Sequence, residues 1–292
     1  MGSGAPGTGE QGGGEGQQRA SCSPHGDRTL LGASTFPQAL SLRGCRTTLW
    51  RMPHDEHGQP VGEPLDAWTP PPSPPGVVMR GRTVTVEPLS VADHVDALFA
   101  CLADAPDPLW TYMSFGPLAA RSDLDKAVRA MIEAGDWCPY AIVTPGDGPC
   151  GIACHLRVQP SIGVIEIGSI VLSPRLQRTT AATEALYLLM RHAFDLGYRR
   201  CEWKCDALNA PSRRAAERLG FVYEGTFRQA THYKGRNRDT AWYAIIDADW
   251  PALDAAFTAW LAADNFDAEG RQRRGLGSFR SALPAQGRGY SG

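Results

Sequence analysis

The stretch Ile165–Leu196 reads IEIGSIVLSPRLQRTTAATEALYLLMRHAFDL, and it decides the fold. Its first eight residues form a mostly branched, apolar run that Pro174 ends, which predicts a buried strand. From about Ala181 the apolar residues recur every three or four positions and stop before Gly197, which predicts an amphipathic helix. A strand, a polar turn and a helix in this order point the free N–H groups of the first helical turn at an anion. An ordinary core helix fits the same residues, so this stretch alone leaves both interpretations open.

The composition predicts one folded domain with an extension at each end. The chain has 292 residues, including 32 glycines and 23 prolines, and eight of the first 16 residues are glycine. Residues 70–75 read PPPSPP, which favours a rigid, extended spacer. We therefore expect a disordered Gly-rich extension over 1–51, a Pro-rich arm over 52–79, one domain over 80–262 and a polar tail over 263–292.

Charge and hydropathy argue against several classes of partner. The formal net charge is −2, so no global basic field favours nucleic acid or an acidic lipid surface. No run of about 18 apolar residues predicts a membrane span, and no apolar core behind basic residues predicts a secretory signal. We expect a cytoplasmic protein, either a monomer or a homodimer, that binds neither nucleic acid nor membrane.

The cysteines allow a metal site by spacing but not by context. Cys150 and Cys154 form one pair at four-residue spacing, and Cys201 and Cys205 form another. Both pairs lie in apolar, strand-like runs, where a metal-binding knuckle does not form. Buried free thiols in a reducing compartment are the expected state, and no metal is expected.

The order of the predicted elements is strand, two helices, three antiparallel strands, helix, strand, helix and two strands. This order predicts an α/β (α+β) fold with a central mixed, mostly antiparallel sheet flanked by helices. The first two helices are expected to begin at the caps Ser90–Asp93 and Ser122–Asp125. The aromatic segment Trp110–Pro117 is expected to be either a lid over the core or one wall of a substrate pocket.

Three motifs in this order carry a family resemblance over about residues 80–250. The first is Gln177–Ala182, which is followed by the triplet TEA at 183–185; the second is Asn209-x-x-Ser212. The third is the run RLGF at 218–221, followed by Glu224-Gly225 and Arg228. Together they resemble the GNAT superfamily of acyl-CoA-dependent N-acetyltransferases. The chain looks closest to the Rim-type branch, which acetylates α-amino groups of ribosomal proteins.

The resemblance implies acetyl-CoA as co-substrate and a site for it at the quoted stretch. The N–H groups at the start of the helix would hold the diphosphate, and the strand before the helix would part from its neighbour over 200–206 to admit the pantetheine arm. The N–H of Ile170 or a neighbour would then polarise the thioester carbonyl. The residues implied to bind the co-substrate are Ile170, Leu172, Gln177, Arg178, Thr179, Thr180, Ala181, Ala182 and Asn209. Thr180 departs from the family pattern, which has glycine there because glycine allows close approach of backbone to phosphate.

Two residues are candidates for proton transfer. Ser212 matches the serine proposed in Rim-type enzymes to protonate the departing thiolate, although a helix cap explains it equally well. Asn209 could likewise hold the pantetheine amide or simply cap the short helix. Glu166 is a carboxylate in an apolar strand, where burial would raise its pKa toward that of a general base. A strand glutamate on an exposed face, paired with an arginine, is the simpler alternative. Thr231 stands where the Rim-type branch often has a glutamate, and a water-relayed base remains open.

The sequence therefore predicts an acetyl-CoA-dependent N-acetyltransferase that acts on a primary amine, of a small molecule or a protein N-terminus, by direct attack in a ternary complex. Two alternatives remain open at this point. One is a non-catalytic acyl-CoA-binding or regulatory module with the same fold. The other is an acyltransferase with a different acyl donor.

Overall fold

The computed structural model describes residues 53–280. The expected disordered extension over 1–51 and the end of the expected tail therefore lie outside the described residues. The chain divides into two units after Pro64. In the first unit, residues 53–64 form a turn in which the carboxylate of Asp55 accepts hydrogen bonds from the N–H groups of His57 and Gln59. All elements discussed below belong to the second unit, residues 65–280.

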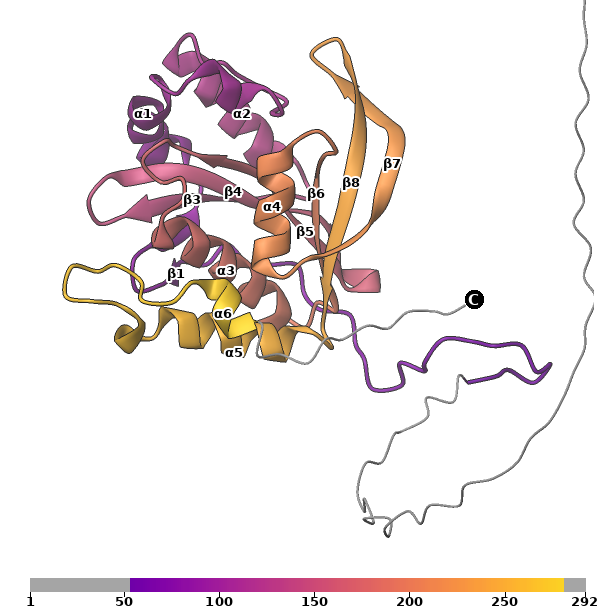
Figure 1. Ribbon diagram of the computed structural model, residues 1–292. Coiled ribbons are helices and arrows are strands. Elements are labelled where there is room, and N and C mark those ends of the chain that lie inside the picture. Colours follow the sequence, from indigo (N-terminus) through magenta and orange to yellow (C-terminus); the bar gives the residue numbers. More distant parts are fainter. Residues whose placement is uncertain (1–52, 281–292) are drawn as a thin grey trace, which may run out of the picture. The chain divides into compact units, whose positions relative to one another are not determined.

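An eight-stranded sheet forms the centre of this unit (Figure 1). The strands lie in the order β1-β2-β3-β4-β5-β6-β8-β7, and all neighbours are antiparallel except β5 and β6. The mixed, mostly antiparallel sheet predicted from the sequence is thus confirmed. The strands are β1 (Met79–Arg80), β2 (Thr85–Pro88), β3 (Cys138–Thr144), β4 (Gly148–Gln159), β5 (Val164–Leu172), β6 (Arg200–Asp206), β7 (Val222–Tyr233) and β8 (Arg236–Ile246).

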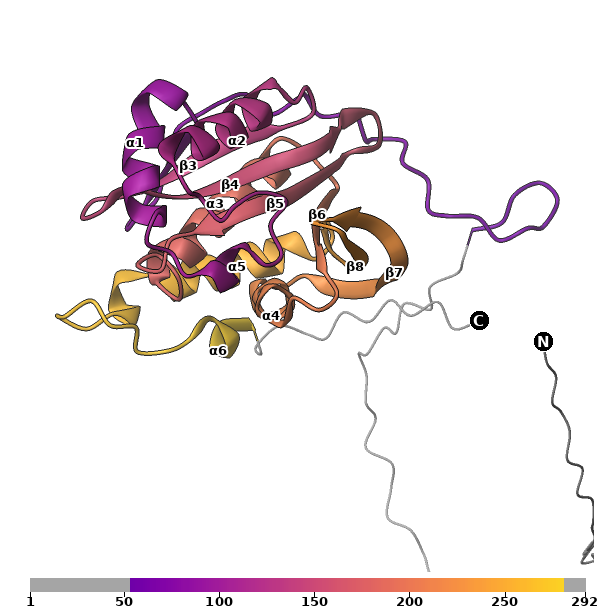
Figure 2. The same ribbon diagram turned by 90° about the horizontal axis from the view of Figure 1, so that it is seen from above.

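Helices cover both faces of the sheet, as Figure 2 shows from above. One apolar cluster joins the sheet to α1 and α2, and a second joins its other face to α3, α4 and α5. None of the helices in the described part of the chain is long and apolar enough to cross a membrane. The helices are α1 (Val91–Leu102), α2 (Arg121–Glu133), α3 (Thr180–Asp195), α4 (Ala210–Leu219), α5 (Trp250–Leu261) and α6 (Leu276–Arg280), with 3₁₀ turns η1 (Asp107–Trp110), η2 (Pro160–Ile162) and η3 (Ala263–Asn265).

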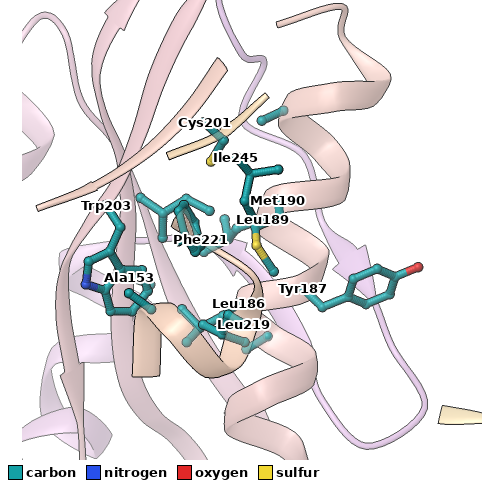
Figure 3. Packing of buried hydrophobic residues seen from close by; sticks show 14 of the residues in the cluster. Ala153, Leu186, Tyr187, Leu189, Met190, Cys201, Trp203, Leu219, Phe221 and Ile245 are labelled. Atoms are coloured by element: carbon teal, nitrogen blue, oxygen red, sulfur yellow. The ribbon is translucent and has the colours of Figure 1, made fainter. Parts of the chain in front are cut away.

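The apolar stripe of α3 makes the larger core. Leu186, Leu189 and Met190 lie on its sheet-facing side and are fully or almost fully buried. They pack toward Trp203 of β6 and Phe221 after α4, as Figure 3 shows. Burying a large apolar side chain of this kind stabilises the fold by about 1.5–3 kcal/mol. The residues at three-and-four spacing in the sequence therefore form the buried face of α3. Packing of this face fixes the position of the helix and of its N-terminus.

The first two helices begin differently from expectation. Ser90 does cap α1 by accepting from the N–H of Asp93, but His94 Nδ1, not Asp93, accepts from the N–H of Ser90 at 2.9 Å. In α2 the N-cap is Ala120, and the expected cap at Ser122 was wrong. The carboxylate of Asp123 accepts there from the N–H groups of Ala119 and Ala120, which supplies the acceptor that an alanine cap lacks.

The proline-rich arm, as far as it belongs to this unit, packs on the domain. Tyr198 and Tyr140 donate hydrogen bonds to the carbonyls of Pro72 and Pro75. The guanidinium of Arg199 lies 5.8 Å from the ring centroid of Trp68. These contacts hold the proline-rich arm against the domain although it has no regular secondary structure.

The segment after residue 262 corrects the expected polar tail. Residues 263–280 fold against the domain through η3 and α6, with Phe266 and Leu276 buried. The buried amide of Asn265 donates to the carbonyls of Trp260 and Arg274. Few apolar anchors hold this segment, which is why its composition alone indicated a tail.

Candidate active site

The parallel strands β5 and β6 separate halfway along their length. They pair from Val164–Arg200 to Glu166–Glu202, and no further pairing between them follows. Yet β5 continues to Leu172 and β6 to Asp206. A gap between backbone edges therefore opens just beyond Glu166, as the resemblance implied.

A bulge in β5 accompanies the separation. The register with β4 shifts between Ile152 and Cys154, and Ser169 takes a left-handed backbone with φ 49°. A bulge of this kind bends a strand and re-aims its groups. Here it turns β5 away from β6 while β4 and β5 stay paired on the other side.

Ile170 and Leu172 direct their N–H groups into this gap. The N–H of Ser173 donates to Cys150 of β4, and Val171 pairs with Ile152 two residues earlier. Hydrogen-bonding direction alternates along a strand, so the intervening residues face the other edge. These two predicted co-substrate residues thus present donors where β5 has no strand partner.

The start of α3 also exposes donors. Thr179 is the N-cap, and its hydroxyl accepts from the N–H of Ala182 at 3.1 Å. In the described residues, the N–H groups of Arg178, Thr180 and Ala181 donate to no protein acceptor. Three unpaired N–H groups at the positive end of a 16-residue helix are the kind of donors that suit an anion.

Two other predicted residues have structural roles in this turn. The N–H of Gln177 donates to Ser173, and its side-chain amide donates to the carbonyl of Leu172. The N–H of Thr179 donates to Leu176. Gln177 and Thr179 therefore shape the loop, and their N–H groups are not open donors.

Thr180 fits its position without the backbone freedom of glycine. It is the first residue of α3, and the left-handed backbone of this turn falls on Arg178, with φ 61°. The threonine therefore has an ordinary helical conformation, and its N–H remains open. The departure from the family pattern does not block the loop.

Glu166 is buried beside the gap and is not alone. Its side chain is 6% exposed, and one carboxylate oxygen lies 2.9 Å from Lys204 Nζ and 3.5 Å from Arg157 Nε. Burial raises the pKa of Glu166, against the opposing attraction of Lys204 and Arg157. The carboxylate is thus buried with a raised pKa, as expected, but it also has the basic partners of the simpler alternative.

Glu202 shares Lys204 with Glu166. Its oxygens lie 2.6 Å from Lys204 Nζ and 2.7 Å from Arg200 Nε. Burial alone would raise the pKa of Glu202, but the ion pair with Lys204 and the charged hydrogen bond from Arg200 outweigh it and lower that pKa. Of the two neighbouring carboxylates, Glu166 is therefore the one whose environment favours taking up a proton.

The other face of the gap carries Ser212. Trp203 Nε1 donates to Ser212 Oγ at 3.0 Å, and Asn209 Oδ1 accepts from the N–H of Ser212 as the N-cap of α4. Side chains alternate between the faces of a strand, so Trp203 points opposite to Glu202 and its register partner Glu166. Glu166 and Ser212 therefore approach the gap from opposite sides.

The β7–β8 hairpin holds the aromatic segment. Lys234 Nζ donates to the carbonyls of Trp110 and Phe115, and Arg236 donates to that of Thr111. Tyr233 donates to the buried carboxylate of Asp206 at the end of β6. The hairpin tip thus ties residues 110–115 to the same end of β6 as the gap.

Sequence reasoning missed Lys204, Glu202 and the Asp206–Tyr233 pair. A signal for them was present in β6, where charged residues alternate with apolar ones. The charged positions are Arg200, Glu202, Lys204 and Asp206, and the apolar positions are Cys201, Trp203 and Cys205. Strict alternation predicts one charged face.

The described cysteines are free thiols, and no group of metal-ligating side chains occurs among residues 53–280.

Comparison with known proteins agrees with this geometry. Residues 83–222 match the family model of the acetyltransferase (GNAT) domain. A GCN5-related N-acetyltransferase from Brucella melitensis is 44% identical, with a TM-score of 0.72 over 74% of this chain and 100% of that chain. A probable acetyltransferase of the GNAT family from Chromobacterium violaceum is 38% identical, with a TM-score of 0.63 over 66% and 98%. The chain therefore belongs to the GNAT family of acetyltransferases, whose general reaction is acetyl transfer to amines.

A more distant structure shares the fold. It is the acetyltransferase from Salmonella typhimurium that modifies the N-terminal serine of ribosomal protein L7/L12, which is 24% identical with a TM-score of 0.50 over 57% of this chain and 96% of that one. No match was found among curated proteins.

Proposed function

We propose that this protein transfers the acetyl group of acetyl-CoA to a primary amine, of a small molecule or a protein N-terminus, by direct attack in a ternary complex. The observation that carries the proposal is the gap between β5 and β6 beyond Glu166, next to three open N–H groups at the start of α3. The gap suits an extended pantetheine arm, and the N–H groups suit a diphosphate. When bound, acetyl-CoA supplies the thioester that the amine attacks.

The proposal gives each residue of the site one chemical role. The N–H groups of Arg178, Thr180 and Ala181 hold the diphosphate, and that of Ile170 polarises the thioester carbonyl as charge develops on its oxygen. Glu166 accepts the proton that the amine loses on one face of the gap. Ser212 donates a proton to the departing thiolate on the other face, and the proton is restored from solvent while Glu166 releases its own to solvent. The oxygen of Ser212 accepts from Trp203, and this bond does not use the hydroxyl hydrogen.

Asn209 combines the helix cap with the co-substrate contact that the resemblance implies. Its side-chain oxygen caps α4 through the N–H of Ser212. We assign its side-chain oxygen to holding Ser212 in place and its amide N–H₂ to the pantetheine. The aromatic segment 110–115, tied down by the hairpin, forms one wall of the acceptor pocket.

Location and assembly belong to the proposal as well. The buried thiols of Cys154 and Cys201 are free, and burial raises the pKa of Cys154 to about 12. Such thiols suit a reducing cytoplasm. We expect a monomer or homodimer.

A thiol-release assay over a panel of primary amines tests the proposal. The panel contains small amines and peptides with free N-termini, and acetyl-CoA binding is measured separately by calorimetry. We expect at least one amine to release CoA thiol above the rate of hydrolysis, with acetylated amine formed in equal amount. Binding of acetyl-CoA without thiol release for any amine in the panel would contradict catalysis.

A further inference from the structure

Two arginines without acidic partners among the described residues lie at the end of α4, and one of them contacts α3. Arg218 is near the end of α4, and Arg280 is the last residue of α6. Figures 1 and 2 both show α6 against the end of α4. We call Arg218 and Arg280 the arginine pair.

Arg218 reaches α3 directly. Its Nη2 donates to the hydroxyl of Thr183 at 3.0 Å, and Thr183 is 4% exposed. Thr183 comes two residues after Ala181, the last of the open N–H groups. One helical turn rises by about 5 Å, so the guanidinium lies roughly one turn from the proposed diphosphate site.

Arg280 is fixed beside it by backbone carbonyls. Its Nη1 donates to the carbonyls of Glu217 and Arg218 at 2.6 and 2.8 Å. Its Nε is buried and has no hydrogen-bond partner among the described residues. A buried donor without an acceptor costs about 1–3 kcal/mol, so this arrangement favours an added acceptor.

The charge of the pair is not balanced by protein. Within residues 53–280, neither guanidinium forms a salt bridge, whereas Arg121, Arg200 and Arg271 each pair with two carboxylates. Burial lowers the pKa of both side chains in the pair, and for Arg218 the charge of Arg280 lowers it further. Two like charges held together in this way indicate a site for an anion.

We propose that the arginine pair binds the 3′-phosphate of coenzyme A, so that the segment after α5 contributes to co-substrate recognition. This rests on the proposed function, which places the diphosphate at the start of α3. The ribose that carries the diphosphate on its 5′ carbon carries this phosphate on its 3′ carbon, so the two anions lie one sugar apart. A phosphomonoester dianion accepts several hydrogen bonds, and arginine is well suited to donate them.

Dephospho-CoA, which lacks only the 3′-phosphate, provides the direct test. Dissociation constants for CoA and dephospho-CoA are measured by calorimetry on the full chain. We expect the wild-type protein to bind CoA at least about tenfold more tightly, the equivalent of about 1.4 kcal/mol. In Arg218→Gln and in Arg280→Gln that ratio should fall toward one, while binding of dephospho-CoA changes little.

Arg271→Gln is the matched control. It removes the same charge from the same C-terminal segment, but its guanidinium is already paired with Asp267 and Glu269. We expect this variant to keep the wild-type ratio. A general loss of folding would weaken both ligands together and leave the ratio unchanged, so the ratio separates recognition from stability.

The titrations distinguish failure of the 3′-phosphate site from failure of the proposed function. Equal binding of CoA and dephospho-CoA by the wild-type protein, or an unchanged ratio in both variants of the pair, would overturn this inference while leaving the proposed function intact. Absence of binding for both ligands would overturn the proposed function itself.

Discussion

Replacing Glu166 with glutamine should lower kcat by roughly 10²–10³-fold while the affinity for acetyl-CoA stays within about threefold, the scale expected for loss of a general base. Glutamine keeps the shape of the side chain but cannot accept the proton of the attacking amine. The position matters because Glu166 is the last residue of β5 that pairs with β6. Its carboxylate therefore lies where the gap begins. Steady-state kinetics with a saturating amine, together with calorimetry for acetyl-CoA, measure the two quantities separately.

Glu202→Gln is the control for this experiment. Glu202 is the register partner of Glu166 and shares Lys204 with it, but Arg200 also binds it and its pKa is lowered. We expect this variant to lose less than about tenfold in kcat, because the lowered pKa of Glu202 makes its carboxylate a poor proton acceptor in the wild-type protein. Turnover of Glu166→Gln within about twofold of wild type would remove Glu166 from the mechanism.

The pH dependence gives a second readout for Glu166. A general base must be deprotonated to act, so activity falls as the pH drops through its pKa. Because burial raises the pKa of Glu166, the acidic limb of kcat/KM should lie above the usual range of a glutamate. That limb should be absent from the residual activity of Glu166→Gln.

Replacing Glu184 with alanine should lower the free energy of unfolding by roughly 3–5 kcal/mol. Glu184 is 3% exposed, and its carboxylate accepts from the N–H groups of Arg82 and Thr83 and from the hydroxyl of Thr83. The substitution leaves these donors without an acceptor inside the protein, and each such donor costs about 1–3 kcal/mol. Urea unfolding followed by far-ultraviolet circular dichroism measures the change.

Glu133→Ala provides the comparison for Glu184. Glu133 is an exposed glutamate at the end of α2, so its loss should change the unfolding free energy by less than about 0.5 kcal/mol. A loss below about 1 kcal/mol in Glu184→Ala would show that water replaces the carboxylate. The link between α3 and the β1–β2 turn would then be weaker than the structure indicates.

Local signals in the sequence were sufficient for the strand, turn and helix that form the site. The apolar periods of β5 and α3 are dictated by the two faces that each buries, so the boundaries of α3 could be predicted to within about a residue or two. The parting of β5 from β6 came from the family resemblance and not from periodicity. It depends on the bulge at Ser169, for which the residues give no local signal.

The site contacts that could not be predicted from the sequence depend on residues far apart in the chain. Glu166 and Lys204 are 38 positions apart, and they meet only because β5 and β6 pair in parallel. The contact of Arg280 with the end of α4 was also hidden, since the segment after α5 is polar and looked like a tail. Its few apolar anchors, Phe266 and Leu276, are too widely spaced to form a periodic pattern.

The proposed function places the diphosphate on open backbone N–H groups at the start of α3, and substitutions of Thr180 test one of these groups on its own. Proline is favoured at the first position of a helix, and Thr179 has φ −93° and ψ 163°, which suits the residue before a proline. Thr180→Pro therefore removes one N–H with little strain, whereas Thr180→Gly keeps the N–H and removes the side chain.

Calorimetric titration of both variants with acetyl-CoA is the deciding measurement. A hydrogen bond to a charged group contributes about 1.5–3 kcal/mol, so Thr180→Pro should bind acetyl-CoA roughly 10–100-fold more weakly than wild type. Thr180→Gly should bind as tightly as wild type or more tightly. A folded Thr180→Pro protein that binds acetyl-CoA with wild-type affinity would contradict this diphosphate site, because the diphosphate would then not rest on these N–H groups.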